Sequence, residues 1–200
     1  MRLTIRLTLA LGALLSCVLA LSAGSALADL QPGGSGSSTS SIVFPSTTDG
    51  EDPITVTLTT DSPVAVSDDS AAAGAGIVGP ATTTYIKSWS LTMQSSLWGI
   101  AWKETQNGAF YFDGKYVWQN HRFSWDTSGY HHCGLSSGIG FSITVQSCYK
   151  YGDPSISPNH MTLGDQFRVS VLIKGFPIYS THEMAVCAYP SGALTTCIWK

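Results

Sequence analysis

FYFDGKYVW, residues 110–118, gives the strongest indication of the fold class. Two aromatic-rich runs flank Asp113-Gly114, a pair that suits a two-residue type I′ turn because both residues tolerate positive φ. Such a turn places Tyr111 opposite Tyr116, and side chains alternate between the two faces of the hairpin. One face would then carry Phe110, Phe112 and Val117, and the other Tyr111, Tyr116 and Trp118.

Alternation with a period of two continues after this hairpin, in FSITVQ at residues 141–146 and in FRVSV at residues 167–171. Turn signals rich in glycine and proline separate the runs, at residues 127–129, 152–154, 175–177 and 190–192. Short alternating strands between such turns are typical of antiparallel architectures. We expect an all-β domain, either an antiparallel β-sandwich or a small barrel.

Residues 88–104 fit two secondary structures. Trp89, Met93, Leu97 and Ile100 would line one face of a helix. The same segment also alternates, is rich in Ser, Thr and Trp, and is interrupted by Gly99. We favour two strands with a break near Gly99.

The sequence contains five cysteines, of which Cys17 lies in the N-terminal apolar run. The other four allow three disulfide connectivities. Neighbouring cysteines each flank a predicted strand-turn-strand, and no C-x-x-C spacing indicates a metal site. We therefore predict a domain braced by two disulfides, Cys133–Cys148 and Cys187–Cys197.

Residues 1–28 have the pattern of an export signal. Arg2 and Arg6 precede an apolar run, and Ala26-Leu27-Ala28 is a typical cleavage site. We expect cleavage after Ala28, a secreted extracellular protein, and no stable membrane anchor once the signal is removed. Lipid attachment at Cys17 is a less favoured alternative, because the apolar run continues beyond it.

Residues 29–80 differ in composition from the rest of the chain. They are rich in Ser, Thr, Gly, Ala and Asp, and contain no Lys, Arg, Trp or Tyr. Such a segment buries too little apolar surface to offset its ordering entropy. We expect a disordered, acidic low-complexity linker or pro-segment there, followed by the β domain at residues 81–200. ITVTLT, residues 54–59, is the exception, since its alternation suits a strand that docks on something.

The charge balance argues against one class of partner. The formal net charge is −3 and the sequence pI is about 5.9. Proteins that bind the phosphate backbone usually show clustered basic residues and a strongly basic pI. Nucleic acid is therefore not an expected partner.

Two patterns raise the question of catalysis. GLSSG, residues 134–138, matches the G-x-S-x-G motif, whose nucleophile would be Ser136. That motif needs a strand-to-helix elbow, whereas here a strand is predicted to follow, so a turn is the better interpretation. Glu104 and Glu183 could act as a pair of carboxylates in glycoside hydrolysis, but nothing in their spacing determines their separation. No catalytic residue is assigned.

The histidines show no ligand spacing of the H-x-H or H-x-x-x-H type. On a strand, His131 and His132 would point to opposite faces, so they could not readily share one metal ion. No metal or other cofactor is expected.

The aromatic hairpin gives the most specific hint of function. If its phenylalanine face joins the core, a platform of Tyr111, Tyr116 and Trp118 could stack on a sugar or peptide. The competing interpretation is that these rings simply pack. The favoured function is a secreted, non-catalytic binding or cell-surface domain that recognises a glycan or an extracellular protein. The alternatives are a small secreted hydrolase, glycosidase- or esterase-like, and a bacteriocin-like effector.

Overall fold

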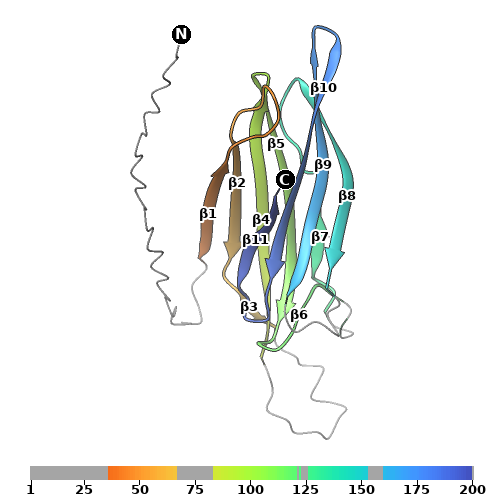
Figure 1. Cartoon of the computed structure of the whole chain (residues 1–200). Helices are drawn as coiled ribbons and strands as arrows, with labels where there is room; N and C mark the ends of the chain where they lie inside the picture. The colour runs from red at the N-terminus through yellow and green to blue at the C-terminus, as the bar shows by residue number, and fades with distance from the viewer. Residues whose placement is uncertain (1–35, 67–82, 121, 123–125, 153–159, 200) are drawn as a thin grey trace, which may run out of the picture. The chain divides into compact units, whose positions relative to one another are not determined.

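Two antiparallel β-sheets make up the part of the chain that the structure describes (Figure 1). The structure, a computed structural model, describes residues 36–66, 83–120, 122, 126–152 and 160–199. The strands are β1 (Ser37–Phe44), β2 (Ile54–Asp61), β3 (Val64–Val66), β4 (Thr84–Leu97), β5 (Ile100–Phe112), β6 (Val117–Trp118), β7 (Tyr130–His132), β8 (Phe141–Tyr151), β9 (Met161–Ile173), β10 (Phe176–Ala188) and β11 (Leu194–Trp199). None of these residues belongs to a helix long and apolar enough to span a membrane.

The larger sheet has the order β1-β2-β4-β5-β6, with β3 paired to β4 and β7 paired to β5. The smaller sheet has the order β11-β10-β9-β8. One continuous hydrophobic core takes side chains from both sheets, which confirms the predicted β-sandwich. Alternation along each strand explains the core, because every second residue points between the sheets. On β9, for example, the buried apolar residues are Met161, Leu163, Phe167, Val169 and Val171.

The segment 88–104 forms two strands, as predicted. β4 and β5 pair in register from Tyr85↔Phe112 to Leu97↔Ile100. Trp98 and Gly99 make the turn between them, and both have positive φ, 53° and 76°. Such a pair of left-handed residues is what a two-residue hairpin turn requires.

The hairpin at residues 110–118 forms, but its turn is longer than predicted. Tyr111 pairs with Trp118 and Phe112 with Val117, so residues 113–116 make the connection and Tyr116 lies in the turn. The cause is the carboxylate of Asp113, which accepts hydrogen bonds from the amides of residues 115 and 116, at 2.9 and 2.6 Å. The register moves by two residues, so Tyr111 and Trp118 still share one face.

The domain begins earlier than the predicted boundary at residue 81. Strands β1, β2 and β3 lie within the segment expected to be a linker, and β2 buries Ile54, Val56 and Leu58 in the core. ITVTLT is thus the docking strand that its alternation predicts. The composition of β1 predicted a disordered linker, but serine and threonine can also occupy a paired strand. Ser41, for example, forms a hydrogen bond with Thr57 across the β1–β2 pair, at 2.8 Å. The predicted signal segment 1–28 and the linker residues 29–35 and 67–80 lie outside the described residues.

Both predicted disulfides are present. Cys187 and Cys197 join neighbouring strands β10 and β11, with their Cα atoms 5.7 Å apart. Cys133 follows β7 in the larger sheet and Cys148 lies on β8 in the smaller one, with their Cα atoms 5.9 Å apart. The first bridge therefore links the two sheets.

A chain that begins at residue 81 is expected not to fold on its own. It lacks the three buried aliphatic side chains of β2, each of which contributes roughly 1.5–3 kcal/mol when fully buried. Urea unfolding followed by tryptophan fluorescence should give one cooperative transition for residues 36–200 and none for residues 81–200. Equal midpoints for the two chains would contradict the inclusion of β1–β3 in the domain.

Candidate functional site

Polar and sulfur-containing side chains converge between the sheets where β5 lies near β9. β5 directs residues 104 and 106 inward, and β7 pairs with β5 so that His131 lies opposite Gly108. In the other sheet, β8 pairs with β9 so that Cys148 lies opposite Asp165. We call this group the inter-sheet polar cluster: Glu104, Gln106, His131, Cys133, Cys148 and Asp165.

Two carboxyl groups of this cluster face each other, and we call Glu104 and Asp165 the acid pair. Both residues are 0% exposed. Burial, followed by the charge of Asp165, raises the pKa of Glu104 to about 8. Burial also raises the pKa of Asp165 to about 6, although the backbone amide of Gly134 acts in the opposite direction. Because two buried carboxylates repel each other, the pair retains one proton near neutral pH.

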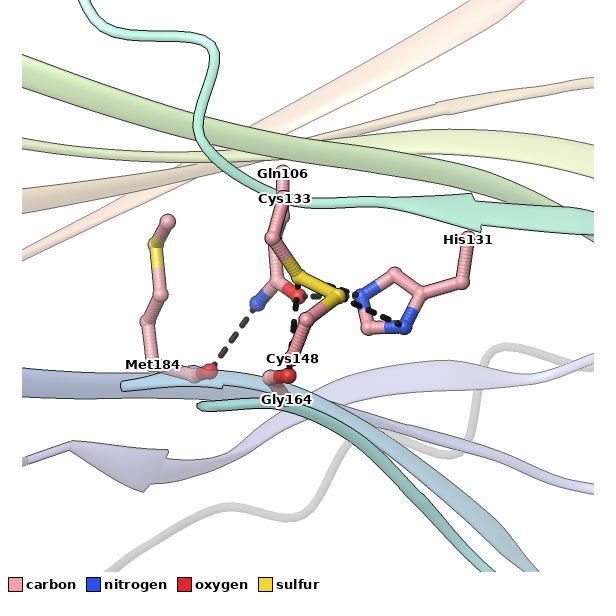
Figure 2. The surroundings of a disulfide bond; sticks show 6 residues. All are labelled: Gln106, His131, Cys133, Cys148, Gly164 and Met184. Carbon is pink, nitrogen blue, oxygen red and sulfur yellow. Dashed lines mark hydrogen bonds between the residues drawn. A yellow bond between two sulfur atoms is a disulfide. The ribbon is translucent and has the colours of Figure 1, made fainter. Parts of the chain in front are cut away.

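His131 lies beside both Gln106 and the inter-sheet disulfide (Figure 2). The amide nitrogen of Gln106 donates to the carbonyl oxygen of Met184 at 3.0 Å, which leaves its Oε1 atom as an acceptor. His131 Nε2, 2.8 Å from that oxygen, therefore carries the ring hydrogen. The ring lies beside the bridge, with Nε2 3.4 Å from Cys133 Sγ and Nδ1 3.9 Å from Cys148 Sγ. Burial, together with the charges of His132 and Lys150, lowers the pKa of His131 to about 4.

A second polar group, the loop cluster, joins the β1–β2 connection to β10. It consists of Ser46, Glu51, Ser180 and His182. His182 Nε2 lies 2.7 Å from Ser180 Oγ and 3.0 Å from Glu51 Oε1. Burial alone would raise the pKa of Glu51, but hydrogen bonds within the cluster outweigh it and lower the pKa. A pocket of about 270 Å³ adjoins the cluster, with Phe44, Ile54 and Met93 among its walls.

The loop cluster differs from a catalytic triad in one respect. In a triad, the serine and the acid contact different nitrogens of the histidine ring. Here both Ser180 and Glu51 approach the same nitrogen, and Ser180 is buried. The arrangement suits a hydrogen-bonded brace between the sheets better than an activated nucleophile.

The carboxylate pair considered from the sequence is not brought together. Glu104 points into the interior, whereas Glu183 alternates with the buried His182 and Met184 and so lies on the outer face of the smaller sheet. Glu183 therefore lies on the face of the smaller sheet that is turned away from Glu104, and the two carboxyl groups do not converge in one pocket as the glycosidase interpretation requires. Ser136 lies exposed in the loop after β7 and not at a strand-to-helix elbow.

The predicted aromatic platform is buried. Tyr111 is 2% and Trp118 0% exposed, and their rings stack with centroids 5.8 Å apart. The chain after β6 folds back over them: Asp126 accepts a hydrogen bond from Trp118 Nε1 at 2.6 Å, and Ser128 donates its amide to the Tyr111 hydroxyl at 3.0 Å. Tyr116 is half-buried beneath the guanidinium of Arg122, 4.0 Å from its ring centroid. Packing, the competing interpretation, accounts for this face.

A different pair of tyrosines lies at the surface, on the outer face of the smaller sheet. Tyr149 and Tyr151 alternate along β8, with ring centroids 4.8 Å apart, and we call them the outer tyrosine pair. Tyr151 is 64% exposed. The ring of Tyr149 lies across Gly164, where a Cβ atom would come within 2.1 Å of the ring, and its hydroxyl donates to Glu183 Oε1 at 2.6 Å.

This pair was missed from the sequence, although its spacing of two on an alternating strand is a usable signal. What the sequence could not provide is the neighbour, because Gly164 and Glu183 come from two other strands. Burial, and then the hydrogen bond to Glu183, raise the pKa of Tyr149 above its ordinary value. The phenol therefore remains a protonated donor at neutral pH.

No protein-family model, curated protein or solved structure matches the chain. The chemistry of these residues is therefore the basis on which a function is proposed.

The acid pair is expected to make the protein less stable as the pH rises. A carboxyl group with a raised pKa keeps its proton in the folded state but loses it in the unfolded state. The free energy of unfolding therefore decreases as the pH rises, until the pH exceeds the pKa of the group in the folded state. The lowered pKa of His131 has the opposite effect, but only below about pH 6.5, where the histidine of the unfolded chain is protonated. The free energy of unfolding should therefore fall by roughly 1–2 kcal/mol between pH 6.5 and 8.

Glu104→Gln should flatten this dependence and raise the stability at pH 8, as measured by urea unfolding. Asp61→Asn, which alters an exposed carboxylate at the end of β2, is the control and should leave the slope unchanged. The same slope in the wild type and in Glu104→Gln would contradict the assignment.

Proposed function

We propose that the chain is an exported, non-catalytic binding domain and that its ligand is an extracellular glycan. The observation that carries the proposal is the outer tyrosine pair beside the carboxylate of Glu183. Aromatic rings that present a face to solvent stack on the apolar faces of sugar rings, and a neighbouring carboxylate accepts hydrogen bonds from sugar hydroxyls.

The geometry of Tyr149 supports a preorganised site. Its ring lies across Gly164 and its hydroxyl is held by Glu183, so little rotamer entropy remains to be lost on binding. Tyr151 extends the aromatic surface by one exposed ring on the same strand. An open surface with two rings, whose planes are inclined by 39°, suits an extended saccharide chain better than a small molecule, which usually binds in a concave pocket.

Two observations support a binding role over catalysis. The acid pair, which has the most perturbed carboxyl groups among the described residues, is fully buried between the sheets, away from any substrate. Ser136 is exposed, but it lies on a loop without the elbow that activates such a serine.

Export is supported by the pattern of residues 1–28 and by the two disulfides, which persist in oxidising compartments. An extracellular environment is also where a glycan ligand would be met.

Replacement of the outer tyrosine pair is expected to abolish glycan binding. The purified wild type should bind defined members of a glycan array, and Tyr151→Ala should weaken the best ligand about tenfold, the loss of roughly 1.4 kcal/mol. Tyr149→Ala and Glu183→Gln should weaken it as well, because each removes part of the site. The dissociation constant from isothermal titration calorimetry is the measurement.

Tyr179→Ala is the matched control. Tyr179 is also an exposed tyrosine, but it lies on β10 beside Arg168 and is not part of the outer tyrosine pair. This variant should bind as the wild type does. An array without hits, or equal affinity in Tyr149→Ala/Tyr151→Ala, would overturn the proposal. Capture of an extracellular protein, release of sugar from the ligand or growth inhibition of neighbouring cells would each identify one of the alternative functions instead.

A further inference from the structure

We propose that reduction of the inter-sheet disulfide creates a zinc site whose protein ligands are His131, Cys133 and Cys148. One nitrogen and two sulfur atoms of these residues lie within 4.8 Å of one another. Zinc bound to two thiolates and one imidazole needs ligand atoms roughly 3.5–3.8 Å apart, so the required movements are small. Among the described residues, this is the single such group of histidine, cysteine and acidic side chains.

The hydrogen bonds of the histidine set its tautomer. Its Nε2–H group donates to Gln106, which is itself held by the carbonyl oxygen of Met184 (Figure 2). Histidines that bind metals usually donate their other ring N–H in this way, because the hydrogen bond sets both the tautomer and the ring orientation. The remaining nitrogen, Nδ1, carries the lone pair and lies 3.9 Å from Cys148 Sγ, while Nε2 lies 3.4 Å from Cys133 Sγ. Binding of zinc through Nδ1 therefore requires the ring to turn toward the two sulfur atoms. Gln106 thus acts as a positioning residue.

The disulfide is open to attack at one of its sulfurs. Cys148 lies exposed on the edge strand β8, whereas Cys133 is half-buried. A small thiolate attacks Cys148 Sγ, and Cys133 leaves as a thiolate that takes up a proton. A second small thiol then attacks the mixed disulfide at the sulfur of the first, which releases Cys148 as a thiol. In sum, the protein disulfide and two small thiols yield the protein dithiol and one small-molecule disulfide.

Zinc binding then exchanges two protons for one metal ion. Both thiols are deprotonated as they bind, and His131 contributes its Nδ1 lone pair. The fourth position is left to water, because Cys148 lies at the surface. The consequence is structural: the two sheets stay linked by sulfur–zinc–sulfur where the covalent bond has been reduced.

Cobalt(II) is the direct probe of this site. The exported chain, reduced with excess 2-mercaptoethanol and desalted under argon, should bind one Co²⁺ with a thiolate-to-cobalt charge-transfer band, and Zn²⁺ should displace it. The oxidised chain should show no such band. X-ray absorption of the zinc-loaded wild type should find two sulfur ligands and at least one nitrogen ligand, a result that needs no variant to fold.

Variants locate the ligands. His131→Ala should weaken Co²⁺ binding at least tenfold, and Gln106→Leu should weaken it about tenfold, as the loss of an outer partner usually does. His132→Ala, which alters the neighbouring exposed histidine, and Cys187→Ser/Cys197→Ser, which removes the other bridge, should bind as the wild type does. Thermal melts of the oxidised variants show whether each one is folded.

Three results would overturn the proposal. These are the absence of a charge-transfer band in the reduced wild type, equal Co²⁺ affinity in Cys133→Ser/Cys148→Ser, and a zinc coordination shell without nitrogen.

Discussion

The two sheets are held at a fixed separation by one layer of large rings, and the buried polar groups are arranged around that layer. Trp102 from β5 packs edge-on against Phe167 from β9, with ring centroids 5.8 Å apart, and stacks on His182 from β10 at 4.7 Å. His182 also belongs to the loop cluster, and the acid pair lies two residues away from Trp102 and Phe167 along β5 and β9. Each polar group reaches from one sheet to the other, so the sandwich is held by hydrogen bonds and charge as well as by apolar burial.

Burying the acid pair costs stability, and the inter-sheet disulfide lies where it can offset that cost. A bridge that closes a loop of this length contributes about 3 kcal/mol by restricting the unfolded chain. Cys133 precedes Gly134, whose amide partly compensates Asp165, and Cys148 pairs with Asp165 itself. The bridge therefore links the two sheets next to the acid pair, where repulsion between the two carboxyl groups would otherwise favour their separation.

Local sequence patterns predicted the strands, but they did not predict the contacts between residues that are far apart in the sequence. Alternation identified the segments around residues 54–59, 88–104, 110–118, 141–146 and 167–171, and cysteine spacing identified both bridges. The hairpin register was off by two residues because the side chain of Asp113 caps a longer turn. The acid pair could not be predicted, since Glu104 and Asp165 become neighbours only when the sheets pack. The burial of Trp118 was missed for the same reason, because its covering partner Asp126 comes from a segment without strand pattern.

The division of aromatic residues between the faces of the two sheets explains why the proposed ligand site lies on the smaller sheet. On the larger sheet, Tyr111 and Trp118 hold the returning chain in place, and this use of their hydrogen-bonding groups removes them from the surface. On the smaller sheet, Gly164 provides a floor without a side chain, so Tyr149 can lie across the strand and still be reached from solvent. A larger residue at position 164 would lift the ring away from the sheet and break its hydrogen bond to Glu183. The absence of a Cβ atom at one position thus decides whether the outer tyrosine pair forms an ordered surface or two independent side chains.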